Sequence, residues 1–212
     1  MPPILAIHLA IPVIVCGTQR DLFSVNNHLD SAVGYLLGLT EVGCALSLLY
    51  GTATRIAAAV LAIVWLAGCL VCSLPPMLEN AHVLGFAIFF FCTGRGPLSL
   101  DRLLLPRLEP PEPILQYAMP ALRIGLGISL TVVAFTEKLA NLPMALTFLQ
   151  RYPVNFTASM GMPLSDQTFI LCAGSTELII GLLILFNIFP RRFGHSMDSV
   201  QPHPLLLQLE LN

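Results

Sequence analysis

Six apolar segments with few charged residues make up most of this chain of 212 residues. A helix that crosses the hydrocarbon core of a bilayer needs about 20 mainly apolar residues. Charged residues are 10% of the chain, against about 25% in a typical soluble domain. A soluble fold of this length could not hide so much apolar surface from water. We therefore predict an all-α, polytopic membrane bundle of about six transmembrane helices, over residues 3–18, 31–50, 53–74, 81–93, 117–135 and 169–189.

The polar stretches between these segments predict how the chain is divided. Residues 106–113 are rich in proline and glutamate, a composition typical of a stiff connector. We expect a four-helix unit over 1–105, a linker over 106–116, a two-helix unit over 117–192 and a cytoplasmic tail over 193–212. The loop 141–166 carries apolar residues of its own, and we expect a short amphipathic helix there, lying on the membrane surface.

Positive charge predicts the orientation, because short cytoplasmic loops are enriched in Lys and Arg. With six spans, one side of the membrane holds Arg20, Lys138 and Arg151. The opposite side, which includes both termini, holds Arg55, Arg95, Arg102, Arg107, Arg123, Arg191 and Arg192. We expect a multi-pass protein of the inner (plasma) membrane with both termini in the cytoplasm. The formal net charge of −2 gives no basic surface for nucleic acid, so the expected partner is the lipid bilayer.

Two pairs of segments indicate a partial internal repeat. A shift of 117 residues aligns the first segment with the fifth, and a shift of 136 aligns the second with the sixth. In the second alignment, Thr40-Glu41 coincides with Thr176-Glu177, and Arg55 coincides with Arg191. An even number of helices separates the copies, so the repeat is predicted to be parallel.

The two repeated glutamates are the leading candidate site residues. An ionisable carboxyl group in the middle of a membrane span is costly and usually marks a proton relay, a pathway or a ligand site. Glu41 and Glu177 are therefore candidate proton-handling residues, with a purely structural hydrogen-bonded role as the alternative. Glu137 and Lys138, at the end of the fifth segment, are candidates of the same kind, and Arg20-Asp21 occupies the matching place after the first.

Weaker signals concern metal and thiol chemistry. Glu79 and His82 are three residues apart, which places them on one face of a helix and makes them weak candidates for metal ligands. Cys69 and Cys72 could form a redox dithiol, but two buried thiols are the more usual finding. After the fourth segment, Ser99 or Asp101 is expected to cap a following helix.

Three stretches of the sequence together resemble the DoxX family of small membrane proteins. The first runs from Leu39-Thr-Glu41 to Tyr50-Gly-Thr-Ala-Thr-Arg55. The second joins Glu79-x-x-His82-x-x-Gly85 to Gly94-Arg-Gly-Pro-Leu-Ser-Leu-Asp101. The third comprises Phe135-Thr-Glu137-Lys138-Leu139 and Ala173-Gly174-x-x-Glu177-Leu178-x-x-Gly181. The likeness covers most of residues 3–192, as one four-helix unit plus half of another.

The resemblance implies a subunit of a membrane redox complex, because the family is similar to a subunit of an archaeal thiosulfate:quinone oxidoreductase. A quinone is then the candidate cofactor, and the expected partners are other membrane redox proteins or a second copy of the chain. Residue patterns alone equally suit a proton-coupled carrier or channel for a small solute, or a non-catalytic assembly partner. Whether the chain is itself part of an enzyme is left open by its sequence.

Overall fold

The computed structural model describes residues 2–94, 100–101 and 112–188. These residues form helices joined by turns and contain no β-strand, which confirms the predicted all-α fold. The predicted linker 106–116 and the tail 193–212 lie largely or wholly outside the described residues. The longer elements are α1 (Pro2–Gln19), α2 (Ala32–Tyr50), α3 (Thr54–Val71), α5 (Ala81–Thr93), α8 (Ala118–Val133), α9 (Leu142–Arg151) and α10 (Asp166–Phe186).

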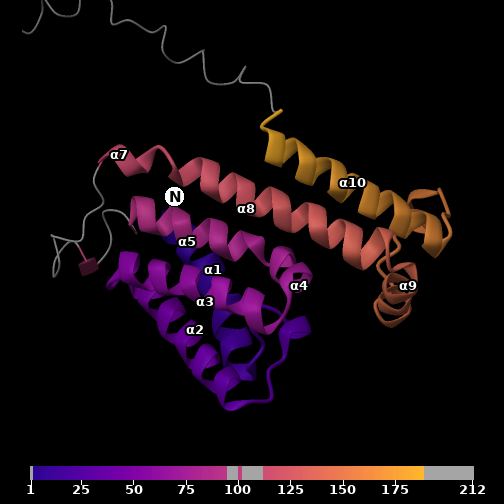
Figure 1. The fold of residues 1–212 in the computed structure, drawn as a ribbon. Helices are drawn as coiled ribbons and strands as arrows, with labels where there is room; N and C mark the ends of the chain where they lie inside the picture. The colour runs from indigo at the N-terminus through magenta and orange to yellow at the C-terminus, as the bar shows by residue number, and fades with distance from the viewer. Residues whose placement is uncertain (1, 95–99, 102–111, 189–212) are drawn as a thin grey trace, which may run out of the picture.

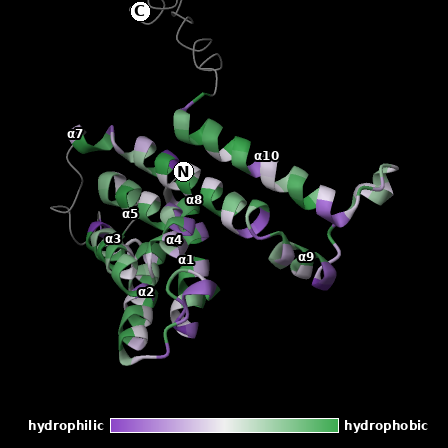
Figure 2. Cartoon of the chain, turned by 45° about the vertical axis from the view of Figure 1, so that its right-hand side comes forward, coloured by the Kyte–Doolittle hydropathy of each residue, from purple (hydrophilic) through white to green (hydrophobic). Residues whose placement is uncertain are grey.

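Four stretches of helix are long and apolar enough to cross a membrane: α2, α3, residues 113–139 and α10. The apolar helices α1 and α5 are shorter. Figure 2 shows hydrophobic residues along most of the length of these helices. Many large apolar side chains remain exposed on them, including Leu39, Ile63, Leu70 and Ile179. Exposed apolar helix surface of this extent is expected where lipid is the solvent, so the structure supports a membrane protein.

Helices α1, α2, α3 and α5 pack around one core, at whose centre lie Leu48, Leu61 and Phe90. Helix α8 packs along α5, and α10 packs along α8 (Figure 1). Glycines allow the helix axes to approach closely, as is common between helices in membranes. A Cβ atom on Gly125 would lie 2.7 Å from the Cα of Gly85, so the α5–α8 contact depends on both residues lacking a side chain.

In each predicted copy of the repeat, α1–α2 and α8–α10, the two helices pack as neighbours. Thr40 donates its hydroxyl to the carbonyl of Leu36 at 2.7 Å, and Thr176 donates to that of Cys172 at 2.8 Å. These matching features agree with a duplication, but the repeat itself stays a prediction.

Several boundaries differ from the predicted ones. The third segment was predicted to extend to residue 74, but α3 ends at Val71, and Pro75 and Pro76 lie in the first turn of a short helix, α4 (Leu74–Glu79). Proline is well suited to the first turn of a helix, where its missing N–H group has no helical partner. Helix α10 starts at Asp166 rather than at residue 169, because the hydroxyl of Ser165 caps it by accepting from the backbone N–H of Thr168. The predicted short helix in the loop 141–166 is present as α9.

Candidate functional site

Most of the candidate site residues lie at the end of the bundle where α4 and α9 are found (Figure 1). The loop 20–31, helix α4, the C-terminal end of α8 and the N-terminal part of α10 meet there. Four elements that are distant in sequence therefore supply the ionisable groups described below.

Glu41 is fully buried, with 0% of its surface exposed. Its Oε1 accepts a hydrogen bond of 3.1 Å from the backbone N–H of Phe23, in the loop after α1. Its Oε2 is buried and has no hydrogen-bond partner among the described residues. Phe23 holds a left-handed backbone (φ 60°), which is unusual for an aromatic residue. The carboxyl group of Glu41 thus holds the loop against the bundle.

Glu177 lies in a different environment from Glu41, although the two glutamates occupy equivalent positions in the predicted repeat. Its Oε1 pairs closely with Nζ of Lys138, and the two side chains are 33% and 29% exposed. The acid in α2 is therefore sealed in the core, while the acid in α10 forms a half-exposed ion pair. In each predicted copy of the repeat, the glutamate of the second helix contacts the chain just after the first helix. Glu41 contacts Phe23 after α1, and Glu177 contacts Lys138 after α8.

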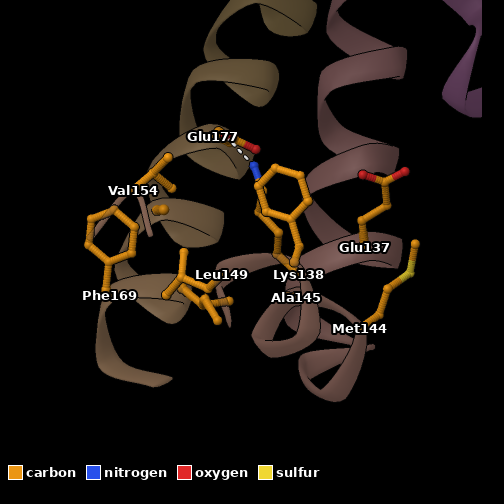
Figure 3. A pocket seen from close by; sticks show the side chains of 11 residues that line it. Glu137, Lys138, Met144, Ala145, Leu149, Val154, Phe169 and Glu177 are labelled. Carbon is orange, nitrogen blue, oxygen red and sulfur yellow. Dashed lines mark hydrogen bonds and ion pairs between the residues drawn. The ribbon is translucent and has the colours of Figure 1, made fainter. Parts of the chain in front are cut away.

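The Lys138–Glu177 pair forms part of the wall of a pocket of about 450 Å³ between α9, α10 and the end of α8. Figure 3 shows Lys138 and Glu177 joined over the pocket, with the carboxylate of Glu137 on the other side of Lys138. The other lining residues are mostly apolar: Met144, Ala145, Phe148, Leu149, Val154, Phe169, Ile170 and Ala173.

A π-helical turn, η3 (Ala134–Leu139), carries both Glu137 and Lys138. The N–H of Ala140 donates to the carbonyl of Phe135 at 2.7 Å, a bond that spans five residues. Such turns are rare in proteins overall, and those that occur are often found at functional sites. Across the bundle, Nδ2 of Asn26 donates to Oε1 of Glu137 at 3.4 Å, so the loop 20–31 also reaches η3.

Glu79 and His82 both contact the stretch of chain formed by α8 and η3. Thr136 donates its hydroxyl to Oε1 of Glu79 at 2.8 Å, and Ser129 donates to the backbone carbonyl of Glu79. Nδ1 of His82 lies 3.0 Å from the same Ser129 oxygen, within hydrogen-bond distance. Within the described residues, no group of three or more His, Cys, Asp or Glu side chains could hold a metal ion.

The six cysteines, all of which are described, are unpaired. Cys69 and Cys72 are partly buried near the end of α3, and no disulfide joins them. Their redox role stays a prediction. The sequence did not reveal the contacts of the loop 20–31, because they form either within the folded loop or with residues distant in sequence, such as Glu41 and Glu137.

In that loop, His28 lies between two aspartates. Its Nδ1 is 2.5 Å from Oδ1 of Asp21, and its Nε2 is 3.1 Å from Oδ1 of Asp30. Arg20 also contacts Asp30, at 3.4 Å. The hydrogen bond to Asp21, and then that to Asp30, raises the pKa of His28 above its ordinary value of 6.5. Since ionised carboxylates only accept hydrogen bonds, this arrangement suits the doubly protonated ring.

Asp101 was expected, as an alternative to Ser99, to cap a following helix, but the structure shows it at the start of an earlier one. Asp101 caps the N-terminus of α3, far back in the sequence. Its Oδ2 accepts from the N–H of Thr54 at 2.8 Å, and its Oδ1 accepts from the N–H of Ala53. Ser99, the other candidate cap, lies outside the described residues, as do Arg95, Arg102, Arg107, Arg191 and Arg192.

No protein-family model, curated protein or solved structure matches this chain. The DoxX resemblance therefore remains an expectation from the sequence. The structure brings Glu137, Lys138 and Glu177 together at one pocket and places Glu41 apart from them, in the core of the four-helix unit.

Proposed function

We propose that this chain is an integral membrane subunit of a redox-associated complex that faces a quinone. The observation that supports this most is the close Lys138–Glu177 ion pair in the wall of an otherwise apolar pocket. Ionisable groups in membrane segments commonly mark proton relays. Quinone chemistry couples electron transfer to proton transfer, so carboxyl groups beside an apolar pocket are suited to it.

The proposal extends to placement in the cell. The chain is a multi-pass protein of a bacterial inner membrane with both termini in the cytoplasm, and the pocket end lies on the opposite side. The DoxX resemblance and the distribution of Lys and Arg support this orientation. The proposed partners are other membrane redox proteins or a second copy of the chain, as the DoxX resemblance implies.

Purification of the tagged full chain from its native membranes in mild detergent tests the proposal. The expected result is a stable complex that contains a cofactor-bearing redox protein and reduces a short-chain quinone. Glu177→Gln should reduce the quinone activity of the complex while the subunits still co-purify. A chain that purifies without any redox protein, from membranes solubilised under several mild conditions, would contradict the proposal.

A second candidate function is proton-coupled transport of a small solute. The observation that favours it is Glu41, a buried acid within a spanning helix whose Oε2 has no hydrogen-bond partner in the described part of the chain. Transporters commonly place ionisable groups at such depth. Proteoliposomes that contain only this chain should then show proton uptake driven by a solute gradient, and Glu41→Gln should abolish it.

A third candidate, a non-catalytic assembly partner, is favoured by the structural contacts that Glu41, Glu79 and Glu177 each make. In that case the acidic residues would matter for stability and assembly, while quinone reduction and proton uptake by the assembled complex would not change in Gln variants that fold.

A further inference from the structure

We infer that the pocket between α9, α10 and η3 binds a neutral amphiphile whose compact head carries carbonyl oxygens. Lys138 is the hydrogen-bond donor to one of these oxygens. The inference deepens the proposed function and rests on it for the identity of the ligand, because a membrane quinone is an amphiphile of this class.

The size and walls of the pocket indicate the body of the ligand. Its volume of about 450 Å³ falls within the range of about 300–1,000 Å³ that is usual for small-molecule sites. Phe148, Leu149, Val154, Phe169 and Ile170 give it apolar walls, and Figure 3 shows Leu149, Val154 and Phe169 among them. A ring or a short hydrocarbon chain is buried favourably against such side chains.

The polar side of the pocket indicates the head of the ligand. The ammonium group of Lys138 has three N–H donors, and Glu177 uses one of them in the structure. Both side chains are about a third exposed, so the pair is accessible from the pocket. Carbonyl oxygens are acceptors that can share the remaining donors.

The charges beside the pocket argue against a charged head. Lys138 contributes one positive charge, and the carboxylates of Glu137 and Glu177 lie on either side of it (Figure 3). An anionic head would meet two carboxylates, and a cationic head would displace or repel the ammonium group. A neutral head avoids both costs.

Helix α9 provides a path for the tail of the ligand. Its residues Met144 and Phe148 line the pocket and are also exposed on the outer surface. The apolar wall of the pocket therefore continues into apolar outer surface. A hydrocarbon tail that leaves the pocket over these residues stays out of water.

The test is a thermal-shift titration of the purified full chain in detergent with a decyl-substituted benzoquinone. A ligand that binds the folded state raises the melting temperature as its concentration rises. Ala173→Leu fills the pocket from α10 without removing a polar group, and Ala145→Leu fills it from α9 in case the first variant folds poorly. Ser175→Leu, on an exposed position of the same helix, is the matched control.

We expect the quinone to raise the melting temperature of the parent and of Ser175→Leu, and to bind each pocket-filled variant at least about tenfold more weakly. Lys138→Met should also weaken binding about tenfold or more, since a hydrogen bond to a charged group is worth about 1.5–3 kcal/mol. Decanol and a short-chain diacylglycerol are run in parallel. Equal shifts in all variants, or a pocket-dependent shift with diacylglycerol alone, would overturn the inference.

The test of the pocket as a quinone site can be distinguished from the test of the proposed redox complex. Pocket-dependent quinone binding by a chain that co-purifies with no redox protein would refute the complex but keep the site. A quinone-reducing complex whose activity survives Ala145→Leu and Ala173→Leu would keep the function and refute the site.

Discussion

The backbone N–H of Phe23 donates a hydrogen bond of 3.1 Å to Oε1 of Glu41, across 18 residues of sequence and inside the core. No ion pair involves Glu41 in the part of the chain that the structure describes. The carboxyl group serves here as an acceptor for a loop, whereas Glu177 serves as the partner of a cation. The two acids should therefore respond differently to the same substitution.

Glu41→Gln should keep near-parental stability, because the amide oxygen can still accept from Phe23. Glu41→Leu leaves that buried N–H group without an acceptor and should lower the free energy of unfolding by about 1–3 kcal/mol. Thermal melting of both variants in detergent measures the difference. Equal stability of the Gln and Leu variants would show that the hydrogen bond is unimportant.

Glu177→Gln should lose the ion pair with Lys138. A double-mutant cycle with Lys138→Met is expected to give a coupling energy of about 0.2–1 kcal/mol, the range measured for exposed pairs, because both side chains are about a third exposed. The cycle is measured by chemical or thermal unfolding in one detergent. A coupling energy of zero would contradict the pairing seen in the structure.

Asp101→Ala should lower the free energy of unfolding by about 0.5–2 kcal/mol, because it removes the acceptor for two N–H groups at the start of α3. Asp101→Asn retains one side-chain oxygen and should be the milder change. Hydrogen exchange at Ala53 and Thr54 is the specific readout, and both amides should exchange faster in the Ala variant. Unchanged exchange at these amides would rule out the cap.

Stability should fall as the pH rises through the raised pKa of His28. Hydrogen bonds to Asp21 and Asp30 raise that pKa above 6.5, so the protonated ring is favoured in the folded state. The resulting stabilisation is fully present below pH 6.5 and is lost above the folded-state pKa. Melting temperatures between pH 5.5 and pH 8.5 (about three units around neutrality) should show this loss. His28→Gln should flatten the dependence, and an identical slope in that variant would assign it to other groups.

Reporter fusions after Gln116 and after Asn155 should lie on opposite sides of the membrane. Most of the candidate span 113–139, residues 117–139, lies between the two sites, and Lys and Arg predict that Gln116 faces the cytoplasm. Paired alkaline phosphatase and fluorescent protein fusions give complementary signals at each site. Activity of the same reporter at both sites would refute the topology.

The helices could be predicted from the sequence because each apolar segment can be recognised from its own length and composition. The ends of the helices are harder to predict: two adjacent prolines are typical of the residues that follow a helix, but proline also begins helices, and here Pro75 and Pro76 open α4. The apolar run predicts a start of α10 at residue 169, whereas the cap at Ser165, which is a local signal in the sequence, places the start at Asp166.

The site was predicted only in part. Charged residues within apolar segments pointed to Glu41, Glu137, Lys138 and Glu177, but residue type alone does not reveal a partner. The ion pair joins residues 39 positions apart, and the contact between Asn26 and Glu137 spans 111 positions. Such contacts depend on how the helices pack, and on the π-helical turn, for which the sequence offered no signal.

The cap on α3 also has a consequence for the biosynthesis of the chain. The N–H groups that open α3 receive their acceptor from Asp101, and Thr54 precedes it by 47 residues. At the usual elongation rate of about 5–20 residues per second, Asp101 emerges on the order of several seconds later. During that interval, the N-terminus of α3 lacks its side-chain acceptor. Until translation reaches Asp101, the N–H groups of Ala53 and Thr54 have to donate their hydrogen bonds to water or to the insertion machinery.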